Sequence, residues 1–488
     1  MADRTLLKAL TLLICLSVLA LPAPRALSED VYTYQAETVL CVPDFESGAW
    51  RSETAALTVP VAGSLAHEAL VELIARVRAG AAGNYSVLAD LTLLHPGYLA
   101  SCGTALVHLS GEIKQVEPLQ QFMLCQAIAN TVCATGEAKY CVILSDGRSL
   151  ALDRDHRNAV GILTEDRSDD PVVSLSRLLI RRGSIEGMPT EYRADTAVFY
   201  PASAGHGVLA EVRPLSYSSG SPEVIVRTLL NAMSVQPTGL FDVPRVLPLA
   251  EHLTGDPVIE VTPDGENVLT VSFGDDFSAA LSDRGILRSV MMAALTLTMA
   301  VNLPDISGVN CVIGGEPVQG VVPVGLFDGA NEIISFERGY MMWQDFTHFM
   351  LSEAAFFYAN DGEVLTRTLR SVPSAWQFAP LRLMEQLLTG PSYYDSVADL
   401  HRALPEGLAI EDLLSLGSEG DTVTLNVRAE VVDLFEGWPL RKKQNAVYSV
   451  VNTLTELPWC RRVNILFDGA RLPASPGSLS FETAFMRY

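Results

Sequence analysis

NTLTELPWCRRVNILFDG, residues 452–469, describes the end of a helix, a short turn and a strand that closes on Asp-Gly. Pro458 is expected to stop the helix. After it, Val463, Ile465 and Phe467 alternate with other residues, as in a strand that buries mostly one face. Apolar residues at helical spacing give the preceding helix its buried face: Ala446, Val447, Val450, Val451, Leu454 and Leu457.

The same pattern occurs twice more. Residues 130–147 read NTVCATGEAKYCVILSDG, with no gap, and residues 295–315 read LTLTMAVNLPDISGVNCVIGG, with three extra residues in the turn. The intervals are 295 − 130 = 165 and 452 − 295 = 157 residues. A period of about 160 residues indicates a repeated domain rather than a solenoid.

Each repeat also begins alike. An apolar strand and a second extended segment precede an amphipathic helix, and two strands around a turn then lead to the final helix and strand. In the second repeat these two strands are residues 258–261 and 269–273, around Asp264 and Gly265. The opening strands are residues 38–44, 196–201 and 354–361.

The N-terminus has the layout of a secretory signal peptide. Arg4 and Lys8 precede an apolar run, residues 9–21, and small residues follow, so residues 1–28 are predicted to direct export, with an uncleaved anchor as the alternative. Ile14 before Cys15 argues against lipidation, because a lipoprotein signal needs a small residue there. Localisation is therefore predicted to be extracytoplasmic, in the cell envelope or secreted.

Composition bounds the function. With 488 residues, 49% hydrophobic and 19% charged, the chain can form about three packed domains. The net charge is −23, and removal of residues 1–28, which carry three basic residues and one acidic residue, leaves −25. Such an acidic protein would repel nucleic acid and anionic lipid headgroups.

Seven cysteines follow the predicted signal peptide, an odd number at irregular spacing. Most are expected to be buried thiols, which are common in protein cores. Any disulfide is expected in the first repeat, where five of the seven lie, and their pairing is left open: Cys41, Cys102, Cys125, Cys133 and Cys141.

The shared order of these motifs resembles the GerM domain of bacterial sporulation and spore germination proteins. The third repeat carries the resemblance through residues 387–388, 404–407, 452–457 and 463–469. The second keeps Tyr200 and Pro201 but departs at Gly314 and Gly315, where Asp-Gly is expected; the first keeps Asn130, Thr131, Asp146 and Gly147.

The resemblance implies an α+β fold of three tandem small domains. Each would have a mostly three-stranded sheet with two helices on one face, like ring-building folds, and a β-hairpin. The expected boundaries are a signal peptide, 1–28; a divergent first domain, 31–150; a connector, 151–195; a second domain, 196–318; a connector, 319–352; a third domain, 353–476; and a tail, 477–488. Both connectors are expected to lie against the domains.

No catalytic, cofactor-binding or metal-binding residue is predicted. GxSxG, HExxH, CxxC, P-loop and GxGxxG motifs are absent from the sequence, and the eight histidines are scattered singly. The acidic residues Asp153, Asp155, Glu165, Asp166, Asp169 and Asp170 could bind Ca²⁺, although a solvated linker is favoured. The Asp-Gly pairs at 146–147 and 468–469 are interpreted as turns.

Two apolar segments have alternative interpretations. Residues 290–303 are interpreted as a core helix rather than a membrane-inserting one, because the segment is short. Residues 340–349 are rich in aromatic side chains, and burial is favoured over a partner surface.

The sequence therefore predicts a non-enzymatic exported scaffold or adaptor that acts through protein docking. Its partners would be other envelope or sporulation proteins, with self-association as an alternative, no nucleic acid, and membrane contact at most through the N-terminus. The second hypothesis is a peptidoglycan-binding module that uses exposed tryptophans, Trp343, Trp376, Trp438 and Trp459. An enzyme, such as a wall hydrolase, is the third.

Overall fold

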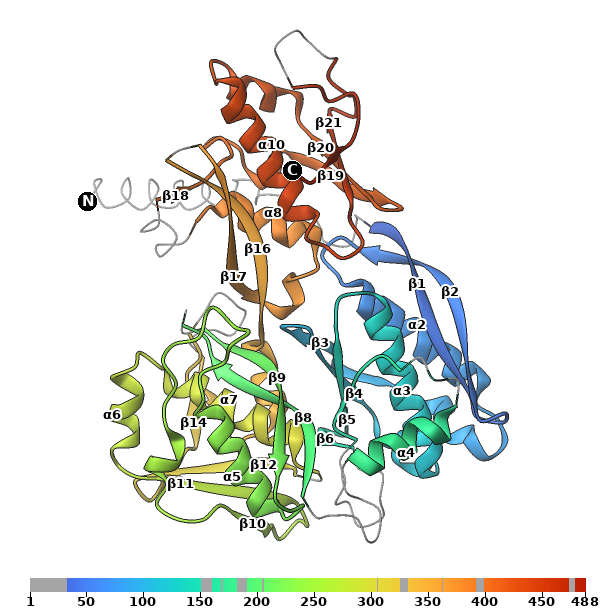
Figure 1. Ribbon diagram of the computed structural model, residues 1–488, viewed down its shortest axis with the longest axis vertical. Coiled ribbons are helices and arrows are strands. Elements are labelled where there is room, and N and C mark those ends of the chain that lie inside the picture. The colour runs from blue at the N-terminus through green and yellow to red at the C-terminus, as the bar shows by residue number, and fades with distance from the viewer. Residues whose placement is uncertain are drawn as a thin grey trace, which may run out of the picture.

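The computed structural model describes residues 33–150, 160–166, 168, 170–181, 191–203, 206–304, 306–324, 332–361, 363–391, 399–473 and 479–488. The same order of elements occurs three times along these residues: a hairpin, a helix, two antiparallel strands, a helix and a strand (Figure 1). The predicted α+β class is confirmed. The predicted signal peptide, 1–28, lies outside the described residues, and the domain boundaries stay a prediction.

The first repeat forms a two-stranded hairpin and a separate mixed sheet in the order β3-β4-β5-β6, with the short strand β7 (Ile162–Leu163) also paired to β5. A β-bulge interrupts β3 between Leu93 and Tyr98, so the Leu-His-Pro-Gly segment lies inside this strand. The elements are β1 (Thr33–Asp44), β2 (Ala49–Pro60), α2 (Leu65–Gly80), β3 (Leu93–Ser101), β4 (Thr104–Leu109), α3 (Pro118–Ala134), β5 (Tyr140–Ser145) and β6 (Arg148–Ser149).

The second repeat has the hairpin β8-β9 and a sheet in the order β10-β11-β12-β13. Its last long helix, α7, is buried nearly all round, which explains why residues 290–303 are so uniformly apolar. The elements are β8 (Tyr192–Pro201), β9 (Val208–Tyr217), α5 (Pro222–Met233), β10 (Val258–Val261), β11 (Asn267–Phe273), α6 (Phe277–Ser282), α7 (Arg288–Asn302), β12 (Gly308–Ile313) and β13 (Glu316–Pro317).

The third repeat has the hairpin β16-β17 and a sheet in the order β19-β20-β21-β22. Its helix α10 ends at Leu454, four residues before Pro458, and the predicted tail supplies β22. The elements are β16 (Leu351–Asn360), β17 (Leu365–Pro373), α8 (Pro380–Thr389), β19 (Leu413–Glu419), β20 (Thr422–Val427), the 3₁₀ segment η8 (Ala429–Phe435), α10 (Leu440–Leu454), β21 (Arg462–Phe467) and β22 (Phe485–Met486).

The same turn follows the last long strand of each repeat. In all three turns two successive residues have positive φ, a conformation that glycine adopts without strain and aspartate tolerates. The first turn residue donates its N–H to the end of the middle strand: Asp146 to Leu109 at 3.0 Å, Gly314 to Phe273 at 3.0 Å and Asp468 to Val427 at 2.9 Å. The Asp-Gly pairs are therefore turn residues.

Gly314 stands where the other two turns have aspartate. A Cβ at position 314 would lie 2.0 Å from Oδ1 of Asp275. The second repeat therefore keeps the turn, and a side chain at position 314 would require the Asp275 carboxylate to move.

A tyrosine and an arginine bind a carbonyl at the C-terminal end of the first helix in the second and third repeats. Arg213 donates to the Tyr200 hydroxyl at 2.7 Å, and both side chains bind the carbonyl of Ala232 near the end of α5. Arg370 and Tyr358 do the same at the carbonyl of Gly390, after α8. These contacts add side-chain donors to carbonyls at the helix end, where intrahelical donors run out.

The first repeat carries Val42 and Ala55 at these two positions, since its hairpin pairs in the same register. Tyrosine and arginine are thus lost together.

Repeats 1 and 3 dock on each other reciprocally. The hairpin of repeat 1 lies against β19 of repeat 3, where Tyr34 stacks on Trp459 with ring centroids 4.5 Å apart. The hairpin of repeat 3 lies against β3 of repeat 1, where Cys102 N–H donates to the Ser352 hydroxyl at 3.1 Å. One continuous hydrophobic core spans the two repeats. Each repeat therefore protects the edge strand of the other.

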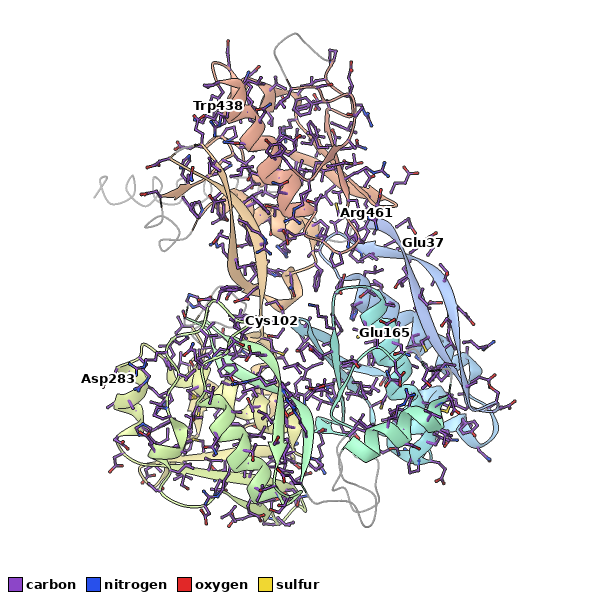
Figure 2. The ribbon with its side chains drawn as sticks, viewed as in Figure 1. Glu37, Cys102, Glu165, Asp283, Trp438 and Arg461 are labelled. Carbon is purple, nitrogen blue, oxygen red and sulfur yellow. The ribbon has the colours of Figure 1, made fainter. Side chains whose placement is uncertain are left out.

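The hydroxyl of Ser101 joins all three repeats. It donates to the carbonyl of Leu351 in repeat 3 at 2.5 Å and accepts the N–H of Ala210 in repeat 2 at 3.0 Å. Ser101 is fully buried, and the neighbouring Cys102 lies in the middle of the molecule, where the three repeats meet (Figure 2).

The described parts of both predicted connectors contact the repeats. β7, within 151–195, joins the sheet of repeat 1, and α4 (Pro171–Arg181) follows it. Within 319–352, the 3₁₀ segment η5 (Trp343–Phe349) enters the core of repeat 2. Strands β8 and β16 begin inside the predicted connectors, at Tyr192 and Leu351, so the ordered hairpins start earlier than expected.

We predict that Ser101→Ala destabilises the chain by ~2–4 kcal/mol, because it leaves the Ala210 N–H and the Leu351 carbonyl buried without a partner. Chemical denaturation measures the change. Ser216→Ala, at an exposed position of β9, is the matched control and should change stability by less than about 0.5 kcal/mol. Equal effects of the two substitutions would contradict the stabilising role of the Ser101 hydroxyl between the three repeats.

Candidate functional site: an open sheet edge in the second repeat

The first strand of the mixed sheet occupies the same edge position in each repeat: β3, β10 and β19. A hairpin from another repeat lies against β3 and against β19. Among the described residues, β10 pairs with β11 on one side and has no strand partner on the other. The edges of β3 and β19 likewise have one strand partner each, so β10 differs from them only in that, among the described residues, no hairpin from another repeat packs against it.

Apolar side chains are exposed on this open edge. Val258 is 49% exposed and Val261 is 69% exposed. An edge strand that presents unpaired backbone groups beside exposed valines is a template for pairing with another chain. Edges are commonly protected by lysine, proline, a bulge, a charged side chain or short length; β10 has no lysine, proline or bulge in its VIEV sequence, but it is only four residues long and carries the exposed Glu260.

The rim of the edge is acidic. Glu260 and Asp264 are exposed beside the two valines, whereas Asp256 is engaged in an ion pair with Arg227. A partner would therefore present apolar side chains flanked by basic ones.

The four tryptophans do not form an exposed binding face. Trp343 is 1% exposed and lies in the core of repeat 2, so its predicted exposure is wrong. Trp376, Trp438 and Trp459 are half-buried, and each has a ring contact: Arg382 over Trp376, Lys442 over Trp438, and Tyr34 stacked on Trp459. Trp438 lies at the far end of repeat 3 (Figure 2).

The aromatic run at 340–349 forms core rather than a surface. Tyr340, Phe346 and Phe349 are buried beside Trp343, and Phe346 meets Phe349 edge-on. The favoured interpretation, burial, agrees with the structure. The bulk of these rings is what fixes the connector onto α7.

The acidic cluster is only partly described. Glu165, Asp166 and Asp170 lie in the described residues, whereas Asp153, Asp155 and Asp169 lie outside them. Oδ1 of Asp170 accepts the N–H groups of Val172 and Val173 and so caps α4. Within the described residues, no three His, Cys, Asp or Glu side chains gather as metal ligands.

The seven described cysteines are free thiols. Cys41, Cys125, Cys141, Cys311 and Cys460 are buried, whereas Cys102 and Cys133 are partly exposed. Burial raises the pKa of the Cys102 thiol to about 12, which keeps it protonated and unreactive at neutral pH.

His108 holds the turn at the end of repeat 1. Its Nε2 accepts the N–H of Gly147 at 2.8 Å, and its ring meets Trp343 edge-on. Burial lowers the pKa of His108 to about 4, so the ring stays neutral and can accept this bond at pH 7. His108 thus has a structural role.

Glu137 is the one fully buried carboxyl in the described residues of repeat 1. It accepts the N–H groups of Leu65 at 2.9 Å and Ala66 at 3.1 Å, and the hydroxyl of Ser64. It therefore caps α2 from the end of α3, as a negative charge at a helix N-terminus does. Burial nevertheless raises its pKa to about 7, against the opposing effect of these three donors.

No helix in the described part of the chain combines the length and the apolar character that a membrane crossing requires.

Comparison with known families supports the resemblance seen in the sequence. Residues 355–473 match the family model Germane, described as sporulation and spore germination. The chain thus contains a GerM-like domain, which covers most of the third repeat. A comparison with curated proteins found no match to this chain.

Two solved structures are similar to parts of the chain. The tandem GerMN domains of the sporulation protein GerM from Bacillus subtilis match at 17% identity and a TM-score of 0.22, over 60% of this chain and 98% of that one. A putative lipoprotein from Clostridium perfringens matches at 20% identity and a TM-score of 0.19, over 28% of this chain and 85% of that one.

Sequence reasoning located β10 but missed its exposure, and it missed the roles of Arg213, Arg370 and Ser101. The two arginines could have been found, because each lies in the second hairpin strand of a repeat that has tyrosine in the first. Ser101 carries no local signal, since its partners lie 109 and 250 residues away.

We predict that Glu137 makes the stability of the chain pH-dependent. Its raised pKa means that it stabilises the fold fully below about pH 4.5 and that this contribution is lost as the pH rises through 7. The wild-type unfolding free energy should therefore fall relative to that of Glu137→Gln across this range, by up to about 3 kcal/mol.

Denaturation from pH 4.5 to 8.5 tests this expectation. Glu37→Gln, at an exposed position of β1, is the matched control and should show no such trend. A wild-type advantage that grows with pH would contradict the raised pKa of Glu137.

Proposed function

We propose that this protein is a non-enzymatic, exported scaffold of a bacterial cell envelope, acting in sporulation or germination. Its open β10 edge docks the amino-terminal hairpin of another GerM-like domain. The matched family model supports the setting. Export is the expectation drawn from residues 1–28 and is part of this proposal.

The observation that carries the proposal is that hairpins of the repeats pack on the edge strands of neighbouring repeats. Each of the two other edges, β3 and β19, is met by a hairpin from a neighbouring repeat. The hairpin of repeat 2 is itself engaged, because β9 contacts β4 and β16. All three hairpins are therefore used inside the chain, and the remaining edge can be covered from outside.

The chemistry of the intramolecular contacts defines the expected partner. At β19 the hairpin contributes an aromatic ring, Tyr34, and at β3 it contributes a serine hydroxyl and a backbone carbonyl, from Ser352 and Leu351. A hairpin that brings one apolar ring, basic flanking residues and open backbone groups fits β10.

The second hypothesis, peptidoglycan binding through tryptophans, has no observation in its favour. Sugar rings stack on open aromatic faces, and the four rings are buried or already in contact with other side chains.

We predict that a photo-crosslinking amino acid at Val261 captures one defined protein partner in sporulating cells. The same amino acid at Val172, an exposed position of α4, is the matched control and should capture none. An adduct of twice the chain mass identifies a second copy as the source of the hairpin, and a different mass identifies another envelope protein.

The double substitution Val258→Lys and Val261→Lys should abolish the adduct formed from a crosslinker at position 260 and leave the melting temperature within about 2 °C, because both valines are solvent-exposed. Val235→Lys, also exposed, should leave the adduct intact. The absence of any adduct at Val261, or an adduct that survives the two lysines, would contradict docking at β10.

A further inference from the structure

The third repeat contains an apolar cavity of about 640 Å³ that is partly open to solvent. It lies between the helices α8 and α10, the sheet strands β20 and β21, and the segment η8. All of its lining side chains are apolar except Asp433, Glu436 and Lys443. The size and lining are those of a small-molecule site, which is typically about 300–1,000 Å³, mostly apolar, with a few polar groups.

The other two repeats fill this place with larger side chains. Phe273 at the end of β11 stacks on Phe277, with ring centroids 4.1 Å apart, and both are buried. The equivalent residues of repeat 1, Leu109 and Ile113, are fully buried.

In repeat 3 the pair at the same spacing is Val427 and Val431, and both line the cavity. The equivalence is fixed by the turn bonds, in which Gly314 donates to Phe273 and Asp468 donates to Val427. Repeat 3 thus has two valines where repeat 2 has two phenylalanines, and the smaller side chains leave part of the cavity volume.

An apolar space of this size is costly when it is empty. Its lining loses dispersion contacts, and water gains few hydrogen bonds there. The favoured occupant is therefore an apolar ligand. A linear acyl chain of about 12–16 carbons falls within the volume range of such sites.

Lys443 is the one basic side chain in the cavity lining and could bind the anionic head group of such a ligand. It is half-buried on α10, and within the described residues its ammonium group forms no ion pair or side-chain hydrogen bond. Its neighbour Lys442 differs, because it lies 4.0 Å from the ring centroid of Trp438. A carboxylate beside Lys443 would meet an unpaired cation that is partly shielded from water.

The other charged residues of the lining limit the head group. Asp433 and Glu436 are both exposed at the same cavity. Two carboxylates beside one ammonium would repel a doubly charged phosphate more strongly than a single carboxylate. The lining therefore favours a monoanion.

We propose that the third repeat binds one single-chain fatty acid, with its hydrocarbon tail between α10 and the sheet and its carboxylate at Lys443. This site is separate from the β10 edge and does not depend on docking there. It would give a scaffold of the envelope a means to respond to free acyl chains.

Titration calorimetry of the full chain with decanoate and dodecanoate, below their micelle concentrations, tests the tail. We expect one site per chain and about tenfold tighter binding for the two added methylenes. The absence of saturable binding by the wild-type chain would overturn the proposal.

Val431→Phe places the ring that repeat 2 carries inside the cavity and should occupy part of the space that the tail would need. We expect at least tenfold weaker dodecanoate binding and a raised melting temperature of the ligand-free chain, with the β10 crosslink unchanged. Val172→Phe, on the exposed face of α4, is the matched control and should bind dodecanoate normally. Unaltered binding by a folded Val431→Phe chain would overturn the assignment of the cavity.

Lys443→Gln tests the proposed contact between the ligand carboxylate and the Lys443 ammonium group, without altering the apolar lining. It should weaken dodecanoate binding about tenfold and leave dodecanol binding unchanged, whereas Lys442→Gln should change neither. Equal loss of the acid and the alcohol, or no loss of either, would contradict a carboxylate at Lys443.

Discussion

Every strand at the edge of a sheet carries backbone N–H and C=O groups that must be paired, covered or left to water. In this chain, hairpins of two repeats cover edge strands of their neighbours. Repeat 1 covers β19 of repeat 3, and repeat 3 covers β3 of repeat 1. The buried hydroxyl of Ser101 then binds the hairpins of repeats 2 and 3 at the centre of the assembly. In the part of the chain that the structure describes, no hairpin packs against the third edge strand, β10.

The divergence of the three repeats follows from their different positions in this assembly. Repeats 2 and 3 keep the Tyr–Arg clamp at the first helix, whereas repeat 1 has Val42 and Ala55 there. Repeat 2 fills its core with the stacked rings of Phe273 and Phe277, whereas repeat 3 carries valines in their place and retains a cavity. The common fold is therefore kept by backbone turns and hydrogen bonds, and side-chain volume is free to differ between copies.

Local patterns in the sequence predicted the elements well. The helical spacing before Pro458 and the Asp-Gly after the strand correspond to α10 and its turn, because helix faces and turn residues are set by neighbours in the chain. Exposure was harder to predict. An aromatic run such as that around Trp343 looks the same on a surface as in a core, and only the packing of η5 on α7 decides between them.

The candidate site was the least predictable part. The residues of β10 were identified as a strand, but whether its edge is open depends on where hairpins from distant repeats lie. The surroundings of Ser101 and Gly314 could not be predicted from the sequence either, because the atoms that they meet belong to residues far along the chain. The order of motifs did predict the GerM-like character of the third repeat, which the family model confirms over residues 355–473.

The most direct test of this account is amide hydrogen exchange of the purified chain at low concentration, compared across the three equivalent edge strands. The account predicts slow exchange in β3 and β19, which lie against hairpins from other repeats, and fast exchange at the outward amides of β10. Exchange in β19 as fast as in β10 would show that the hairpins do not protect these edges, and it would contradict the docking mode on which the account rests.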